Sequence, residues 1–287
     1  MIKLLFIGLM LFSLQSNAVA KSEPEPEPKK LRIVALAPHI VENLFAIGAG
    51  SNIVGTVDYA DYPHEAKNIA RIGGYYGISL EKLLALKPDL VIAWKSGNQQ
   101  EDIAQIERLG IKVHLSNPTS IEGVQTELLT LGKLTGYEKQ SQQVAKVFKH
   151  KLTAIIKNQQ GKLPISGFYQ LWAEPMMTIS ESTWIGQLVS TCHVNNVFAN
   201  STTQYPQISI ENVIVTKPQV IIIPDEKSNT PQPNVNWKAW PEVPAVKNNQ
   251  FIRVNADLLH RFTPRMLDGL ADMCDKIDAS RKQIKSM

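Results

Sequence analysis

The segment SLEKLLALKPDLVIAW, residues 79–94, contains a complete helix-to-strand unit. Ser79 is a residue type that caps helices, and Glu81, at the second helical position, suits the positive end of the helix dipole. The Lys-Pro pair at 87–88 ends the helix, because the residue before a proline avoids the helical region. The apolar run that follows predicts a buried strand ending at Trp94.

The same unit recurs later in the chain as SIENVIVTKPQVIIIP, residues 209–224. Ser209, Glu211 and the Lys-Pro pair at 217–218 stand at the same relative positions as in the first segment. Common helix-start chemistry would account for the Ser and the Glu alone, but not for their recurrence with the same Lys-Pro stop. We therefore interpret the chain as two structurally related lobes.

Apolar strands alternate with helical segments on both sides of these units, which predicts parallel sheets covered on both faces. The fold class is therefore α/β, with two Rossmann-like lobes, each a parallel sheet flanked by helices. The expected strands are 32–37, 52–58, 89–94, 111–116, 164–172, 219–224 and 250–255. The expected helices are 40–50, one from Ser79, one within 99–109, one from Thr119, 183–192, one from Ser209, and 263–282.

The segment between the two lobes predicts one long helix. Residues 138–160 contain no Pro and no Gly, and Val144, Val147, Phe148, Leu152 and Ile155 fall on one helical stripe. Such a helix would be about 33 Å long, enough to connect two domains. We predict an N-terminal lobe over 31–136, the connecting helix over 137–161, and a C-terminal lobe over 162–287.

The start of the chain predicts export. Residues 1–20 combine a basic start, an apolar run and an Ala-Val-Ala end, the pattern of a signal peptide. A membrane anchor is the alternative, but the apolar run is shorter than the roughly 20 residues needed to span a bilayer. Residues 21–30, which alternate Glu and Pro, predict an extended leader that cannot pack a core.

Two cysteines, Cys192 and Cys274, occur in the whole chain. In an oxidising compartment an even pair indicates a disulfide. Two buried free thiols are the alternative. A metal role has little support, because no His or Cys stands at ligand spacing from either cysteine.

The overall composition excludes few classes of function, and the absence of known catalytic motifs excludes more. The net charge of +4 over 287 residues forms no basic stripe of the kind that nucleic acid requires. No nucleophile elbow, phosphate loop or zinc-protease motif is present. The six histidines form no pair at helical spacing, so we predict no metal site. His39 and His260 fall in predicted loops after strands, where they could contact a ligand.

Aromatic residues gather just beyond the ends of the predicted strands. In open α/β sheets, ligands bind beyond the carboxyl ends of the strands. Buried packing could explain any one of these rings. Several rings at strand exits instead favour a cleft for a large, flat, mostly uncharged ligand. The rings are Tyr59, Tyr62, Tyr75, Tyr76, Trp94, Trp172 and Tyr205.

With these features in place, the chain resembles the helical-backbone (class III) substrate-binding proteins of ABC importers, which serve cobalamin, siderophores and haem. The element ALKPDLVI is shared across that family. The resemblance to its cobalamin-binding members covers residues 32–280 and rests on more specific motifs. These are DYADYP (58–63), LEKLLALKPDLVIAW (80–94) with the Gly-Asn pair at 97–98, LGIKV (109–113) and TPR (263–265).

The resemblance implies roles for individual residues. The ligand-binding residues would be Tyr59, Tyr75 and Trp94 from the first lobe, and Trp172 (or Leu171), Tyr205, Asp257, Leu258, Arg261 and Phe262 from the second. Glu81 and Glu211 would dock onto the permease, and Cys192 and Cys274 match the disulfide positions of the family. Tyr205 and Leu258 depart from the pattern, because cobalamin-binding members are expected to have Trp there.

The function implied by the resemblance is capture of cobalamin in the periplasm and its delivery to an inner-membrane ABC importer, a permease dimer with its ATPase subunits. The protein would be a monomer and not an enzyme, with no cofactor besides the transported cobalamin. The alternative ligand is haem, with Tyr59, His260 or Met176 as axial groups, or a ferric siderophore, for which Arg261 and Arg265 are the available cations. A hydrolase built on Ser180, Ser182 and His193 is a third hypothesis, which no motif supports.

Overall fold

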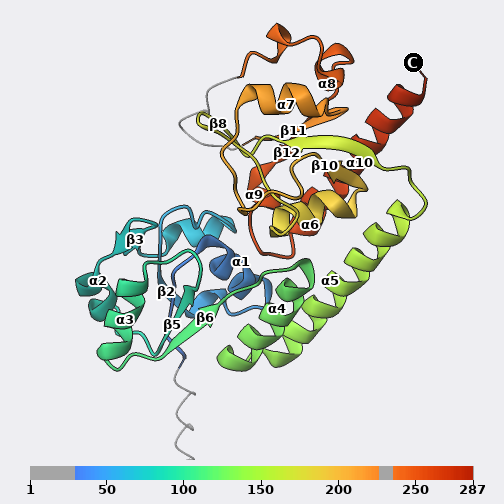
Figure 1. The fold of residues 1–287 in the computed structure, drawn as a ribbon. Coiled ribbons are helices and arrows are strands. Elements are labelled where there is room, and N and C mark those ends of the chain that lie inside the picture. The colour runs from blue at the N-terminus through green and yellow to red at the C-terminus, as the bar shows by residue number, and fades with distance from the viewer. Residues whose placement is uncertain (1–29, 226–234, 287) are drawn as a thin grey trace, which may run out of the picture. The chain divides into compact units, whose positions relative to one another are not determined.

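The computed structural model describes residues 30–225 and 235–286. The predicted signal peptide and nearly all of the predicted Glu/Pro leader lie outside the described residues. Leu31–Met287 form one compact unit. Figure 1 shows two sheets with their helices, joined by one long helix. Among the residues described, no helix is both long and apolar enough to cross a membrane.

The first lobe contains a four-stranded parallel sheet with the order β2-β1-β5-β6. Its strands are β1 (Ile33–Ala35), β2 (Ile53–Thr56), β5 (Leu90–Trp94) and β6 (Val113–Ser116). Successive side chains of a strand point to opposite faces. Ile33 and Ile92 therefore join one core cluster, and Val34 and Val91 join another.

Each face of this sheet is covered by two helices. Helices α1 (Pro38–Ala46) and α4 (Ile121–Thr135) pack on the face of Ile33 and Ile92. Helices α2 (Leu80–Ala85) and α3 (Gln100–Arg108) pack on the face of Val34 and Val91. The predicted parallel sheet with two covered faces is confirmed.

The second lobe repeats this plan. Its sheet has the order β10-β7-β11-β12, again all parallel. The strands are β7 (Ile165–Tyr169), β10 (Val194–Asn196), β11 (Val220–Asp225) and β12 (Phe251–Asn255). Helices α6 (Trp184–Thr191) and α10 (Met266–Lys285) cover one face, and α7 (Ile210–Thr216) and α8 (Pro244–Lys247) cover the other. In each sheet the second of its four strands in chain order, β2 or β10, lies at the edge beside the first, β1 or β7. The two lobes therefore share one topology, and their predicted structural relation is confirmed.

The two repeated units start and stop their helices in similar ways. The Ser79 hydroxyl accepts a hydrogen bond from the Lys82 amide at 3.3 Å. At the second unit, the amide and hydroxyl of Ser209 both donate to Asn212 Oδ1, at 3.0 and 3.2 Å. Lys87 and Lys217 both adopt the left-handed conformation, with φ of 45°. The Lys-Pro pairs therefore end α2 and α7 as predicted.

The predicted connecting helix is α5 (Glu138–Gln159). It packs against α4 and α10 (Figure 1). Phe148 and Leu152 of the predicted stripe are buried, whereas Val147 is exposed. The small residues Ser141 and Ala145, in the first half of α5, are also buried.

Several short elements differ from the sequence-based expectation. The predicted strand 164–172 is too long, because β7 ends at Tyr169 and the Leu171 amide then bonds the Met177 carbonyl. Trp172 therefore begins a separate hairpin. Strand β10 was not predicted, because its sequence VNN is short and polar. The remaining elements are β3 (Gly73–Gly74), β4 (Gly77–Ile78), β8 (Trp172–Ala173), β9 (Met176–Met177), α9 (Ala256–Leu259) and the 3-10 turns η1 (Gly50–Asn52), η2 (His64–Asn68) and η3 (Trp237–Ala239).

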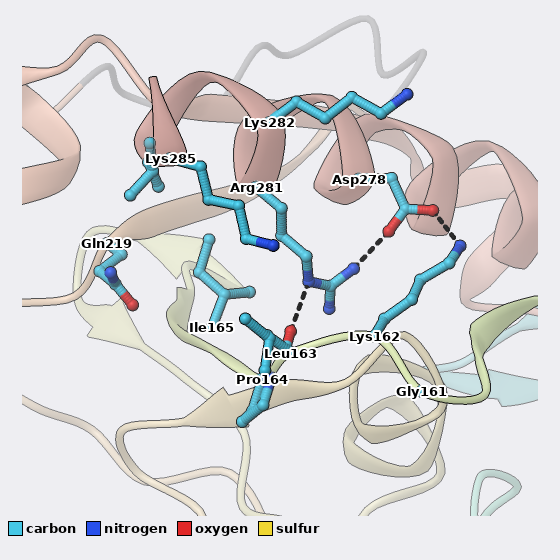
Figure 2. A pocket seen from close by; sticks show the side chains of 11 residues that line it. Gly161, Lys162, Leu163, Pro164, Ile165, Gln219, Asp278, Arg281, Lys282 and Lys285 are labelled. Atoms are coloured by element: carbon cyan, nitrogen blue, oxygen red, sulfur yellow. Dashed lines mark hydrogen bonds and ion pairs between the residues drawn. The ribbon is translucent and has the colours of Figure 1, made fainter. Parts of the chain in front are cut away.

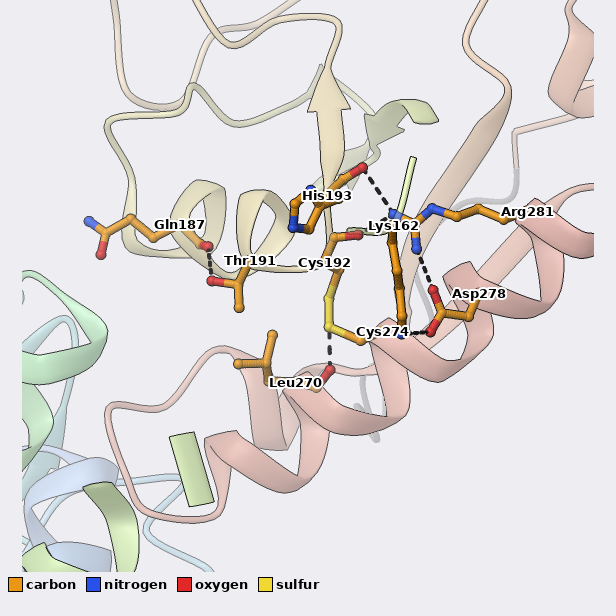
Figure 3. Close-up of a disulfide and its surroundings, with 9 residues drawn as sticks. All are labelled: Lys162, Gln187, Thr191, Cys192, His193, Leu270, Cys274, Asp278 and Arg281. Atoms are coloured by element: carbon orange, nitrogen blue, oxygen red, sulfur yellow. Dashed lines mark hydrogen bonds and ion pairs between the residues drawn. A yellow bond between two sulfur atoms is a disulfide. The ribbon is translucent and has the colours of Figure 1, made fainter. Parts of the chain in front are cut away.

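The predicted disulfide joins Cys192, at the end of α6, to Cys274 in α10 (Figure 3). Both residues are buried. Arg281, two turns further along α10, donates to the carbonyl oxygens of Cys192 and, at 3.0 Å, of His193. The covalent bond and these hydrogen bonds hold α6 and α10 together on one face of the second sheet.

Candidate functional site

The carboxyl ends of the two central strands of the first lobe meet at Trp94 and His39. Trp94 is the last residue of β5, and His39 lies in the first turn of α1, after β1. Asn98 ties the two strand ends together: its Oδ1 accepts from the Trp94 amide at 2.6 Å, and its Nδ2 donates to the Leu36 carbonyl at 2.9 Å. Gly97 is needed here, because a Cβ at this position would lie 1.9 Å from the Trp94 indole.

Aromatic rings from both lobes pack together at this point. The ring centroid of Phe262, from the second lobe, lies 5.5 Å from that of His39 and 6.1 Å from that of Trp94. The ring centroid of Trp184, in α6, lies 4.3 Å from that of Phe262. Phe262 is only 8% exposed. Its place is therefore in the packed contact between the lobes, and it offers little surface to a ligand in this conformation.

A buried ion cluster lies beside these rings. Glu42 of α1 has a side chain that is 2% exposed. Its Oε1 accepts from Arg261 Nη1 at 2.7 Å and from Arg265 Nη2 at 2.8 Å, and its Oε2 accepts from Arg265 Nε at 2.9 Å. Arg261 Nη1 also donates to Asp61 Oδ1 at 2.8 Å, and Asp257 Oδ1 lies 3.4 Å from Arg261 Nη2.

This cluster keeps Arg261 charged. Burial alone would lower the pKa of Arg261, but its hydrogen bonds to Glu42 and Asp61 outweigh burial and raise the pKa above the ordinary value. The Asn43 side chain adds a bond to the Phe262 carbonyl at 2.9 Å. Residues 261–265 of the second lobe are thus attached to α1 of the first lobe by charged and neutral hydrogen bonds.

Other predicted ligand residues present exposed rings. Tyr59 and Tyr75 are each 74% exposed, on segments that follow β2 and β3 of the first lobe. Trp172, in β8, and Tyr205 are 37% and 42% exposed. These four rings offer apolar surface to a ligand, and exposed apolar surface marks a recognition site where it is contiguous.

The structure brings only some of the predicted ligand residues together. Trp94, Phe262, Arg261 and Asp257 belong to the contact between the lobes described above. The Tyr59 carbonyl oxygen joins it, 3.4 Å from Arg261 Nη2. Tyr75 packs instead on Tyr76, at 5.5 Å between ring centroids. The Trp172 indole donates to the Glu174 carbonyl at 2.9 Å. Leu258 lies against Gly269 of α10, where its Cβ would be 2.9 Å from a Cβ built on the glycine.

Sequence reasoning missed Glu42, Asp61 and Trp184, and gave Arg265 only a provisional role. A signal for Glu42 was present, because it is a lone carboxylate in the apolar helix IVENLFAI and a buried charge needs a partner. Its partner arginines lie 219 and 223 residues away in the chain. No local pattern could identify that pairing.

Of the two histidines predicted to lie in loops after strands, His39 is buried and His260 is half-buried. Burial, with a smaller effect of Arg261, lowers the pKa of His39 to about 3. Burial lowers the pKa of His260 to about 4, and its Nε2 lies 2.9 Å from the Tyr169 hydroxyl. Both imidazoles are therefore neutral at neutral pH and offer no positive charge to a ligand.

The stability of the protein is expected to fall in mild acid because of these histidines. Below pH 6.5 the unfolded chain protonates them and the folded protein does not, so their contribution is complete above pH 6.5 and is lost as pH falls towards 4. Each histidine accounts for up to about 1.4 kcal/mol per pH unit. The free energy of unfolding, measured with urea, falls between pH 7.5 and pH 5.0. This decrease should be about 2 kcal/mol smaller in His39→Gln than in the wild type. His150→Gln, at an exposed position of α5, is the control, and an unchanged pH dependence in His39→Gln would contradict the prediction.

The two residues predicted to dock onto a permease occupy equivalent positions. Glu81 and Glu211 are exposed in the first turns of α2 and α7, which cover corresponding faces of the two sheets. Hydrogen bonds with Ser209 and with its own backbone lower the pKa of Glu211. Each lobe thus presents one carboxylate at the start of the same helix of the repeated unit.

A pocket of about 550 Å³ lies elsewhere, between the start of β7 and the end of α10 (Figure 2). Lys162 and Arg281 line it, but both pair with Asp278. None of the predicted ligand residues lines this pocket. Among the residues that the structure describes, no group of three or more His, Cys, Asp or Glu side chains could hold a metal ion.

Two lobes of the same topology, joined by one long helix, define the architecture of a bilobal substrate-binding protein. Residues 33–258 match the family model described as periplasmic binding protein. A vitamin B12-binding protein of Vibrio cholerae is 35% identical over 253 residues, which cover 88% of this chain and 91% of that protein. The chain belongs to the periplasmic binding protein family.

Solved structures give the same result for the fold. The crystal structure of the periplasmic vitamin B12 binding protein BtuF of Vibrio cholerae is 34% identical, has a TM-score of 0.80, and is matched over 88% of this chain and 98% of its own. The periplasmic haem-binding protein RhuT of Roseiflexus sp. RS-1 has a TM-score of 0.75 at 21% identity, over 88% and 99% of the two chains. At that identity the second comparison shows a shared fold alone.

Proposed function

We propose that this protein captures cobalamin in the periplasm, in a cleft between its two lobes, and delivers it to an inner-membrane ABC importer. The observation that carries the proposal is the set of exposed rings beyond the strand ends of both lobes, in a chain that resembles vitamin B12-binding proteins over most of its length. A corrin is large, flat and mostly uncharged, and aromatic faces bind such surfaces well. The lobes of the proposal span 31–136 and 162–287, with 137–161 as the connecting helix.

Within this proposal the ligand contacts fall into two groups. Tyr59, Tyr75 and Trp94 of the first lobe face the corrin, together with Trp172, Tyr205 and Leu258 of the second. Asp257, Arg261 and Phe262 line the contact between the lobes and limit the depth of the site. Glu81 and Glu211 dock onto the two permease subunits, each beside the N-terminus of its helix. The protein acts as a monomer, carries no cofactor of its own and is exported by its signal peptide.

The alternatives find less support in the side-chain contacts. Arg261 and Arg265 are engaged by Glu42, so neither is free to bind an anionic siderophore. His260, a candidate axial group for haem, is half-buried, and its Nε2 lies 2.9 Å from the Tyr169 hydroxyl. For a hydrolase, the Ser180 and Ser182 hydroxyls lie 2.7 Å from each other, and no sequence motif orients a base towards them. We expect no covalent chemistry.

Titration of the mature chain, from Lys21, with cyanocobalamin tests the proposal. We expect tight one-to-one binding by calorimetry and quenching of tryptophan fluorescence. Tyr59→Ala should weaken binding about 10-fold or more, because truncation of a central aromatic anchor typically has that effect. Because the Tyr59 ring is exposed, the substitution should leave the stability of the protein unchanged.

The matched control is Val147→Ala, at an exposed position of the connecting helix, which should leave binding unchanged. Absence of binding at micromolar cyanocobalamin would contradict the proposal. Haem and ferric siderophores, followed by their visible spectra, would then be titrated against the same protein.

A further inference from the structure

The loop that carries Tyr59 has an unusual backbone. Tyr59 has a φ of 63°, in the left-handed region that residues with a side chain seldom adopt. Within the first lobe the loop is held by a bond from the Asp58 amide to the Gly73 carbonyl, at 2.8 Å, and by one from Arg71 to the Ala60 carbonyl, at 2.7 Å. The Tyr59 ring itself is exposed and gives the loop little packing.

The second lobe supplies further contacts to the same loop. Arg261 Nη1 donates to Asp61 at 2.8 Å, and Arg261 Nη2 lies 3.4 Å from the Tyr59 carbonyl oxygen. The guanidinium carbon of Arg265 lies 3.4 Å from the centroid of the Tyr62 ring, the geometry of a cation–π contact. Three residues of the loop are therefore held by two arginines of the other lobe.

Glu42 aligns both arginines. It is buried, and its two carboxylate oxygens accept three hydrogen bonds from Arg261 and Arg265. A carboxylate that engages two guanidinium groups in this way fixes their planes as well as their positions. A pocket of about 370 Å³ beside the cluster is lined by Tyr62 and Arg265, so there is space into which Tyr62 could move if the arginine were lost.

We propose that Glu42, Arg261 and Arg265 are positioning residues, through which the second lobe holds the Tyr59–Tyr62 loop of the first lobe in its ligand-binding conformation. The inference rests on the proposed function, in that Tyr59 contacts the corrin. Affinity for the ligand then depends on contacts between the lobes that the ligand itself does not make. A loop held in place before binding loses less conformational freedom when the ligand arrives.

Two substitutions remove the loop contacts while leaving the Glu42 pairs in place. Asp61→Asn removes the ion pair with Arg261, and Tyr62→Leu removes the ring over Arg265. Tyr62→Phe is the matched control, because it keeps the ring and its cation–π contact. The first measurement needs no ligand. Hydrogen exchange of the backbone amides of residues 57–66 should be faster in Asp61→Asn and Tyr62→Leu than in wild type, and unchanged in Tyr62→Phe.

The second measurement is a double-mutant cycle with Tyr59→Ala, read as the dissociation constant for cyanocobalamin. Tyr62→Leu and Asp61→Asn should each weaken binding about 3- to 10-fold when Tyr59 is present, and much less in the Tyr59→Ala background. A purely structural role would lower the urea midpoint without this coupling to Tyr59.

The outcomes separate the two proposals. If the wild type binds and Tyr59→Ala weakens binding, but the loop variants exchange like wild type and show no coupling, the positioning role is wrong. If the wild type does not bind cobalamin, the proposed function fails, and the hydrogen-exchange comparison alone decides whether the second lobe holds the loop.

Discussion

Replacement of Glu42 by alanine is expected to lower the free energy of unfolding by about 3–5 kcal/mol. The reason is the burial of the cluster: Glu42 is 2% exposed, and the side chains of Arg261 and Arg265 are 13% and 25% exposed. Removal of the carboxylate leaves two guanidinium groups in the contact between the lobes, and Arg265 loses its carboxylate partner. Urea unfolding at pH 7.5, followed by far-ultraviolet circular dichroism, measures the change.

Two variants make the Glu42 prediction specific. Glu42→Gln keeps the shape and one acceptor oxygen, so its loss should be smaller than that of Glu42→Ala. Glu65→Ala, which removes an exposed carboxylate from the neighbouring turn η2, should change stability by less than about 0.5 kcal/mol. Equal and small losses in Glu42→Ala and Glu65→Ala would show that the cluster contributes nothing to the attachment of the lobes.

Removal of the disulfide is expected to have the second largest effect, a loss of about 2–4.5 kcal/mol. The bond joins residues 82 apart in the chain, so it strongly restricts the unfolded state. The double variant Cys192→Ala/Cys274→Ala is preferred to the serine pair, because both positions are buried and a hydroxyl there would need a partner. Urea unfolding with and without a reductant gives the measurement.

Reductant supplies the control for this prediction. The wild type in reductant should approach the stability of the double alanine variant, and the variant should not respond to reductant. Because Arg281 still bonds the carbonyls of Cys192 and His193, we expect α6 to remain on α10 at low denaturant. A wild type that unfolds at the same urea concentration with and without reductant would contradict the prediction.

Local patterns predicted most of the fold. The continuous apolar runs predicted the bounds of β5 and β11 to within one residue. Strands that are buried on both faces contain no polar interruption, so their ends are easy to find. The stretch without Pro or Gly, 138–160, matches α5 to within one residue, whereas the predicted connecting helix, 137–161, is one residue too long at its start and two at its end. Strand β10 was missed because its Val-Asn-Asn sequence has neither length nor alternation. The Trp172 hairpin was missed because the apolar pattern of β7 runs on past its last paired residue.

The candidate site was less predictable, for a physical reason. Exposed rings such as Tyr59 could be found from their place after a strand, since strand ends are local features. The partners of Arg261 could not, because ion pairs form wherever the fold brings charges together, regardless of separation in the chain. The family resemblance implied Arg261 as a ligand contact, whereas in the structure its side-chain partners are Glu42, Asp61 and Asp257. A ligand contact by Arg261 remains a prediction.

The shared strand order of the two sheets bears on how the chain folds. Each sheet is made from one continuous stretch of chain, and none of the described strands is exchanged between the halves. The first sheet can therefore form without any strand of the second, as domains commonly fold as units. Arg261 and Arg265 lie near the end of the chain, so the attachment to Glu42 needs the second half to be present. A chain that ends before residue 256 should thus contain a finished first sheet and lack that attachment.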